Sequence, residues 1–253
     1  MRCVVRLVGT AVLGAAAASW GQAPVASLRV TVNTARVALG GILRVDVATE
    51  NPSAGARDDL YAAVLVPGAG LFFRQVDGGF SAAPAALAPG TAVAAGTTRI
   101  LDLALPASLP SGTYTFFAAY VRAGAQPTLA NLASSLATAD VVVGPATVSF
   151  LAQVRPIFNT NCTSCHFGPF GSGGQDLATD PYGATVDRPA LGSFQGLSLP
   201  RIDPGRPQNS YLLQKLLGTP GIDRSRMPLG QPPLPQRAID TIRTWISEGA
   251  PNN

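Results

Sequence analysis

Short runs of alternating apolar and polar residues most constrain how this chain can fold. Six such runs lie between about Val25 and Gly144, and they are rich in Val, Leu, Thr and aromatic residues: SLRVTVN, ILRVDVAT, LYAAVLV, RILDLAL, GTYTFFAAYV and TADVVVG. Turn-forming sequences such as Asn51-Pro52 and Gly78-Gly79 separate them. A period of two places successive side chains on opposite faces of a strand, so each run can bury one face. Strands at this spacing predict a β-sandwich.

Helical periodicity replaces the strand pattern after Gly144-Pro145. An apolar helix face is expected over the segment before Cys162, with Pro156 as a local disturbance. A second helix is expected over YLLQKLLG, capped by Asn209 or Ser210 and ended by Gly218. The closing segment QRAIDTIRTWISEGA places one apolar face on Ala238, Ile239, Ile242, Trp245 and Ile246. We therefore predict two domains, over residues 24–145 and 146–253.

The first 23 residues read as a secretory signal peptide, although a buried N-terminal helix is the alternative. Arg2 and Arg6 precede the apolar stretch LVGTAVLGAAAAS, and small residues follow up to a cleavage site near Ala23. Export to the periplasm, the medium or the cell surface is the expected localisation. Cys3 would leave with the signal. Elsewhere no apolar run reaches the roughly 20 residues of a spanning helix, so we expect no membrane span after cleavage.

The charge balance gives no reason to expect a nucleic-acid partner. Without Arg2 and Arg6, the 18 basic residues become 16 against 14 acidic residues. No run of Lys or Arg supplies a phosphate-binding patch. Charged residues are only 13% of the chain and hydrophobic residues 47%, which argues against a long disordered protein.

The only His of the chain lies in the sequence Cys162-Thr163-Ser164-Cys165-His166. CxxCH is the attachment motif of c-type haem. Two thiols on one side of a helical turn can reach the two haem vinyl groups, and the next imidazole can bind the iron. A disulfide or a thioredoxin-like redox pair is the alternative, but it needs no His at the fifth position. A structural zinc site would need about four ligands, and this cluster has three unless a carboxylate joins it.

Met227 is the candidate for the second axial ligand of the iron. The chain has no second His, and Met227 is the only Met outside the signal peptide. It lies between Arg226 and Pro228 in a stretch rich in Pro and Gly rather than within an apolar helix face. A thioether is a neutral, soft ligand that raises the reduction potential of haem iron. The alternative is that Met227 only fills the core, which would leave the iron open to a gas or a peroxide.

Residues 147–250 resemble a class I cytochrome c domain at the C-terminus of a secreted bacterial protein. The resemblance rests on VRPIFNTNCTSCH, RIDPGRPQNSYLLQKLLG, RMPLGQPPL and IDTIRTWISEGA. The N-terminal sandwich is similar to immunoglobulin-like modules only in texture. The resemblance implies an immunoglobulin-like all-β sandwich followed by an all-α class I cytochrome c fold. It implies one covalently attached haem c, with Cys162 and Cys165 as thioethers and iron bound by His166 and Met227.

The same resemblance implies further contacts of the haem. Helices over residues 148–160 and 235–249 would pack across each other, with Trp245 and Phe158 beside the haem. Arg201 would meet a haem propionate, although an ordinary solvated Arg is the alternative. The Gly-rich segment 167–196 departs from a minimal domain of this family.

The expected function is one-electron transfer between transient redox partners, a protein donor and a protein acceptor. Once His166 binds iron, no His remains as a general base, so we do not expect an enzyme. One alternative is a haem peroxidase-like enzyme or a gas or redox sensor with an open distal site. The other is a secreted adhesive or structural protein in which the haem domain is an accessory.

Overall fold

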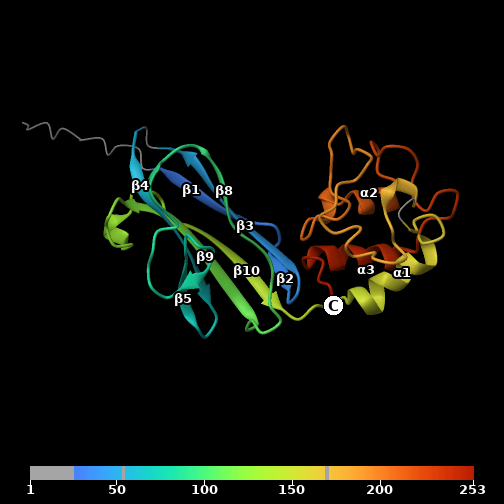
Figure 1. Cartoon of the computed structure of the whole chain (residues 1–253), viewed down its shortest axis with the longest axis horizontal. Helices are drawn as coiled ribbons and strands as arrows, with labels where there is room; N and C mark the ends of the chain where they lie inside the picture. Colours follow the sequence, from blue (N-terminus) through green and yellow to red (C-terminus); the bar gives the residue numbers. More distant parts are fainter. Residues whose placement is uncertain (1–25, 53–54, 169–170) are drawn as a thin grey trace, which may run out of the picture.

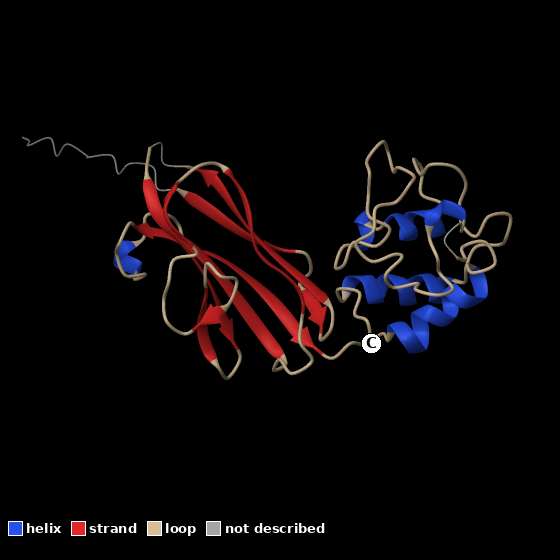
Figure 2. Ribbon diagram, viewed as in Figure 1, coloured by secondary structure: helices blue, strands red, loops and turns tan. Residues whose placement is uncertain are grey.

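The chain forms two lobes, one of strands and one of short helices and loops (Figures 1 and 2). The computed structural model describes residues 26–52, 55–168 and 171–253. The predicted signal peptide, residues 1–23, lies outside the described residues. We call residues 26–144 the β-lobe and residues 145–253 the C-terminal lobe. In the described part of the chain, no helix has the length and apolar character needed to cross a membrane.

The β-lobe consists of two sheets. One has three strands in the order β1-β3-β8, and the other has the order β2-β10-β9-β4-β5-β6, with β7 paired to β4. Pairing is antiparallel throughout except between β10 and β2. The bounds are β1 Ser27–Val32, β2 Arg36–Ala38, β3 Ile42–Asn51, β4 Arg57–Val66, β5 Gly70–Arg74, β6 Phe80–Ser81, β7 Ala88–Ala92, β8 Gly96–Ala104, β9 Gly112–Arg122 and β10 Ala137–Gly144.

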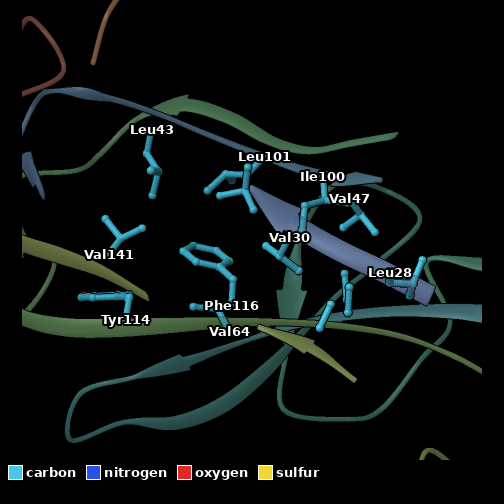
Figure 3. Close-up of a cluster of buried hydrophobic side chains, with 14 of the residues drawn as sticks. Leu28, Val30, Leu43, Val47, Val64, Ile100, Leu101, Tyr114, Phe116 and Val141 are labelled. Atoms are coloured by element: carbon cyan, nitrogen blue, oxygen red, sulfur yellow. The ribbon is translucent and has the colours of Figure 1, made fainter. Parts of the chain in front are cut away.

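The core of the β-lobe lies between the two sheets. Phe116 of β9 is 3% exposed, and its ring points toward the side chains of the opposite sheet, including Val30 and Leu101 (Figure 3). Val45 on β3 is fully buried and pairs with Leu101 on β8, so inward-facing residues meet across the ladder. The strands form here because alternation in the sequence supplies one apolar face to each sheet.

The described part of the C-terminal lobe contains six short helical elements around a small core. They are a π-turn (η2) at Phe150–Val154, α1 at Arg155–Asn161, the 3-10 turns η3 at Ser172–Gly174 and η4 at Pro207–Asn209, α2 at Tyr211–Leu217 and α3 at Gln236–Ser247. Trp245 is fully buried and stacks on Phe150, with ring centroids 5.2 Å apart. Its indole Nε1 donates to the carbonyl of Pro251 at 2.9 Å, which satisfies the polar edge of the ring. This core fixes the direction of α1 and α3.

The predicted all-α class I cytochrome c fold is wrong. The three α-helices of the lobe have only 7, 7 and 12 residues, and the described part of residues 162–210 contains none. That segment has eight glycines and six prolines, which disfavour continuous helix. Isolated β-bridges join Val186 to Ile202 and Pro189 to Pro200 instead. The two-domain fold class is therefore corrected to a largely β chain with a loop-rich C-terminal lobe.

Direct hydrogen bonds join the two lobes. The amides of Ala38 and Ile42 donate to the carbonyls of Glu248 and Gly249 at 2.9 and 2.8 Å. The side-chain amide of Asn33 donates to the carbonyl of Pro204 at 2.8 Å. These bonds connect β2 and β3 to the end of α3 and to the loop before α2. The β-lobe therefore holds the C-terminal lobe in one orientation.

Candidate functional site

A cavity of about 580 Å³ opens in the C-terminal lobe. That volume lies within the roughly 300–1,000 Å³ of sites that hold small molecules and cofactors. Much of the wall is apolar, and its buried members are Phe158, Leu177, Tyr211, Leu216, Leu234 and Ile242. Such a wall offers an occupant an apolar surface on that side of the cavity.

The cavity brings four of the five predicted site residues to one place. Cys162, His166, Arg201 and Met227 all line it, although Arg201 and Met227 are 35 and 61 positions beyond His166. Cys165 is exposed and is not among the lining residues. That residues so distant in sequence line one cavity is the strongest structural support for a common site.

The motif lies on a turn that continues from α1. Cys162 is the C-cap of that helix, and its amide donates to the carbonyl of Phe158 at 2.8 Å. The amides of Cys165 and His166 both donate to the carbonyl of Cys162, at 3.2 and 2.9 Å. One turn therefore holds all three chemical groups, and Phe158 extends its buried ring into the cavity wall one turn earlier.

Backbone contacts fix the orientation of the His166 ring. Its Nδ1 makes a hydrogen bond to the carbonyl of Ser172, and the side-chain amide of Gln175 lies 3.3 Å from the same atom. The carbonyl of His166 accepts from the amide of Leu177 at 2.9 Å. An Nδ1–H that donates to a carbonyl leaves the lone pair on Nε2, which is the atom available to a metal.

Met227 reaches the cavity from a loop. Its amide donates to the carbonyl of Lys215 on α2 at 2.9 Å. Its half-buried side chain packs against the core of the lobe and lines the cavity. Core packing and a ligand role are therefore both compatible with its position, and axial ligation stays a prediction.

Arg201 lines the cavity, but its guanidinium is engaged by the backbone. It donates to the carbonyls of Ala184, Gly173 and Gly174 at 2.7, 3.0 and 2.9 Å. Burial, with a smaller contribution from Arg188, lowers the pKa of Arg201. The predicted propionate contact stays a prediction, while the contact that the structure shows is with the loop after His166.

Two further expectations concern residues beside the haem. Phe158 lines the cavity, whereas Trp245 lies in the core next to Phe150 and is not a lining residue. Sequence reasoning missed Lys215 and Arg224, which add positive charge to the lining. The sequence spacing could have indicated Lys215, because it lies three residues after Leu212 in the predicted helix and therefore on the same helix face. In the structure both residues line the cavity.

The thiols do not have the properties of a redox-active pair. Cys162 and Cys165 are both free. Burial, with a smaller effect of Cys165, raises the pKa of Cys162 to about 11. Reactive cysteines have lowered pKa values, because the thiolate is the nucleophile. A thiol–disulfide oxidoreductase is therefore a poor fit to this site.

Comparisons with known proteins identify no family. No protein-family model matches the chain, and no curated protein matches it. The CARDB domain of a Pyrococcus furiosus protein, solved with di-metal ions, has 13% identity and a TM-score of 0.28, covering 47% of this chain and 86% of that chain. A β-glucosidase from Listeria innocua, solved with glucose, has 14% identity and a TM-score of 0.27, covering 47% of this chain and 16% of that chain.

The identification as a class I cytochrome c domain behind an immunoglobulin-like module is therefore wrong. No family model matches the chain, and the α-helices of the C-terminal lobe are only 7, 7 and 12 residues long. Among residues 26–52, 55–168 and 171–253, no group of three or more His, Cys, Asp or Glu side chains is placed to hold a metal ion. The expectations of a cytochrome c and of metal binding therefore lose the support of the family resemblance. The resemblance rested on short local strings, which do not determine a fold.

Proposed function

We propose that the C-terminal lobe carries one covalently attached haem and transfers single electrons through its iron. The observation that carries this proposal is that Cys162 and His166 line one largely apolar cavity together with Met227, which lies 61 positions after His166. The donor set suits the group: two thiols for thioether bonds, an imidazole and a thioether sulfur. Covalent attachment needs each thiol to reach a separate carbon atom, so the side chains need not converge on one bare ion.

The residues of the chain would divide the work as follows. Cys162 and Cys165 would hold the macrocycle, and His166 would present Nε2 to the iron because Ser172 holds Nδ1. Met227 would supply the second axial ligand, which favours the reduced state. When bound, the haem supplies a one-electron Fe(III)/Fe(II) couple. The buried apolar side chains of the wall would shield that side of the haem from water and would hold its surroundings in place.

Electron transfer implies transient protein partners, a donor and an acceptor. Two cavity-lining side chains, Leu191 and Leu229, are 78% and 65% exposed, so the mouth of the cavity offers a small apolar contact. Short-lived redox complexes use interfaces at the small end of the range. We also propose that the protein is exported through residues 1–23, because haem attachment to CxxCH and an export signal fit the same compartment.

Absorption spectra of the protein made in a periplasm with haem-maturation factors test the proposal. We expect haem that survives denaturation, low-spin spectra in both oxidation states, and a weak far-red sulfur-to-iron band in the oxidised form. Met227→Ala should remove that band. Leu229→Ala changes an exposed residue of the cavity lining and should keep the band.

Two results would change the conclusion. Covalent haem with a high-spin spectrum would remove Met227 from the ligand set and favour a peroxidase-like enzyme or a sensor. Absence of haem from the wild-type chain, with haem present on a control protein made in the same cells, would refute the proposal.

A further inference from the structure

The β-lobe reaches the wall of the cavity through one buried arginine. Arg44 of β3 is only 9% exposed and contacts three carboxylates. Asp102 of β8 is 3.2 Å away within the same sheet, whereas Asp187 and Asp203, at 2.5 and 3.1 Å, belong to the C-terminal lobe. A guanidinium has five donors in a fixed fork, so one side chain can hold all three partners.

The pair Arg44–Asp203 is the buried part of this cluster, whereas the side chains of Asp102 and Asp187 are 45% and 40% exposed. The side chain of Asp203 is 11% exposed, and that of Arg44 is 10% exposed. Burial raises the pKa of Asp203, and the positive charges of Arg206 and Arg44 oppose that rise. A buried carboxylate of this kind is costly without its cation, so the lobes are held together at this point.

Asp187 and Asp203 lie at the base of a loop, residues 184–203, that folds back on itself through isolated β-bridges and contains no regular strand; we call it the ribbon. The amide of Asp187 donates to the carbonyl of Ile202 at 3.0 Å, and the bridges Val186–Ile202 and Pro189–Pro200 continue the pairing. The ribbon supplies four residues of the cavity wall, Ala190, Leu191, Gly192 and Arg201. Arg44 therefore grips the base of the segment that forms one side of the cavity.

The ribbon in turn holds the turn that orients His166. Arg201 donates to the carbonyls of Gly173 and Gly174. Both glycines have positive φ, 70° and 62°, a conformation that side chains rarely adopt. The preceding carbonyl, of Ser172, accepts the hydrogen bond from His166 Nδ1. Ion pairs, hydrogen bonds and short backbone segments thus connect β3 to the imidazole of His166.

We propose that Arg44 is a positioning residue for His166. The β-lobe acts as a rigid support that holds the ribbon, and the ribbon holds the turn that fixes the imidazole. This role rests on the proposed function only in treating His166 as the iron ligand. The mechanical part, that Arg44 restrains residues 166–168 and 171–177, can be tested whether or not haem is attached.

Hydrogen exchange of the full chain, haem-free and reduced, tests the mechanical part. Arg44→Lys keeps the charge but loses the fork. We expect amides in residues 166–168 and 171–177 to exchange between about twofold and thirtyfold faster, the range expected for coupling between distant sites. The amides of β9 should be unchanged. Arg29→Met, which breaks an exposed ion pair with Glu50 in the same sheet, is the matched control and should change none of these amides.

A second variant guards against simple unfolding. Arg44→Met combined with Asp187→Asn and Asp203→Asn removes the cation and both carboxylates of the C-terminal lobe, so neither of those carboxylates stays unpaired. If Arg44→Lys also exposes the β9 amides, this triple variant decides the question. Faster exchange in those amides near His166 with β9 protected supports the proposal. Unchanged exchange in them, while residues 184–203 loosen, overturns it.

The midpoint potential of the haem-loaded chain provides a second measurement on the same variants. If His166 is the ligand, Arg44→Lys should shift the midpoint potential, and Arg29→Met should not. A chain that takes up no haem would refute the proposed function and leave the exchange result standing. If the chain holds low-spin haem but Arg44→Lys leaves amide exchange near His166 unchanged, only the proposed role of Arg44 is refuted.

Discussion

The two lobes use different means to fix their residues. In the β-lobe, ladder hydrogen bonds set the register, and alternation carries Val45, Leu101 and Phe116 into one core. In the C-terminal lobe, loops are held by individual side chains that bond distant carbonyls, as Arg201 does. The alternation of apolar and polar residues in the sequence predicts the strand pairing of the β-lobe. The side-chain bonds of the C-terminal lobe join residues that are distant in sequence, and no local pattern predicts them. These bonds build the cavity.

The difference predicts that core truncations act mainly on their own lobe. Ile246 of α3 is fully buried and does not line the cavity. Ile246→Ala should lower the free energy of unfolding of the C-terminal lobe by about 2–5 kcal/mol. Trp245 is the only Trp beyond residue 23, so its fluorescence during urea unfolding of a chain starting at residue 24 reports on that lobe. The far-UV signal of the strands should move less.

Two companion variants sharpen this comparison. Leu101→Ala, in the core of the β-lobe, should move the strand signal by a similar amount. Leu151 is 54% exposed on the π-turn, so Leu151→Ala should leave both transitions almost unchanged. If Ile246→Ala shifts the unfolding transitions seen by Trp fluorescence and by the far-UV signal equally, the two lobes unfold as one cooperative unit. That result would contradict the expectation.

The pH dependence of thiol reactivity probes the cavity itself. Burial raises the pKa of Cys162 to about 11, from an ordinary value of 9.0. At pH 8 the folded, haem-free, reduced chain should therefore alkylate at Cys162 about a hundredfold more slowly than the urea-unfolded chain, because only the thiolate reacts. The rate should rise with pH until about pH 11. Mass spectrometry after iodoacetamide treatment measures it, with exposed Cys165 as the internal reference.

The same shift has a consequence for stability. Folding raises this pKa, so the folded chain holds the thiol proton more tightly than the unfolded chain does. The resulting contribution to stability is present below about pH 9 and is lost as the pH rises toward about 11. Equal alkylation rates at Cys162 in folded and unfolded chains would show that the wall of the cavity does not shield this thiol.

Local signals in the sequence predicted single elements better than they predicted the arrangement. The runs expected as strands coincide with β1, β3, β4, β8, β9 and β10. The expected helix YLLQKLLG is α2, with Ser210 as N-cap and Gly218 as C-cap. The hydroxyl of Ser210, however, bonds Asp203 and Arg206 rather than the helix amides. Pro156 lies in the first turn of α1, directly after the π-turn.

The candidate site shows where sequence reasoning stops. Spacing and residue type selected Cys162, His166 and Met227, and the structure brings these three to one cavity. The predicted all-α fold was wrong because the glycines and prolines of residues 162–210 favour loops over helices. The contacts of Arg44 with Asp187 and Asp203 join positions more than 140 residues apart, and no local pattern predicts such pairs.

The smallest expected effect compares one glycine from each lobe. Gly218 ends α2 at φ 69°, and Gly90 of the β-lobe has φ 53°. Alanine at either position should cost about 1 kcal/mol or somewhat more in unfolding free energy, because L-residues disfavour this region. A Cβ at Gly90 would meet open space, whereas one at Gly218 would lie 3.0 Å from Cδ of Arg226, next to Met227. Gly218→Ala should therefore cost more than Gly90→Ala in urea unfolding. Equal costs would mean that Arg226 yields freely, and the loop that carries Met227 would then be softer than the packing indicates.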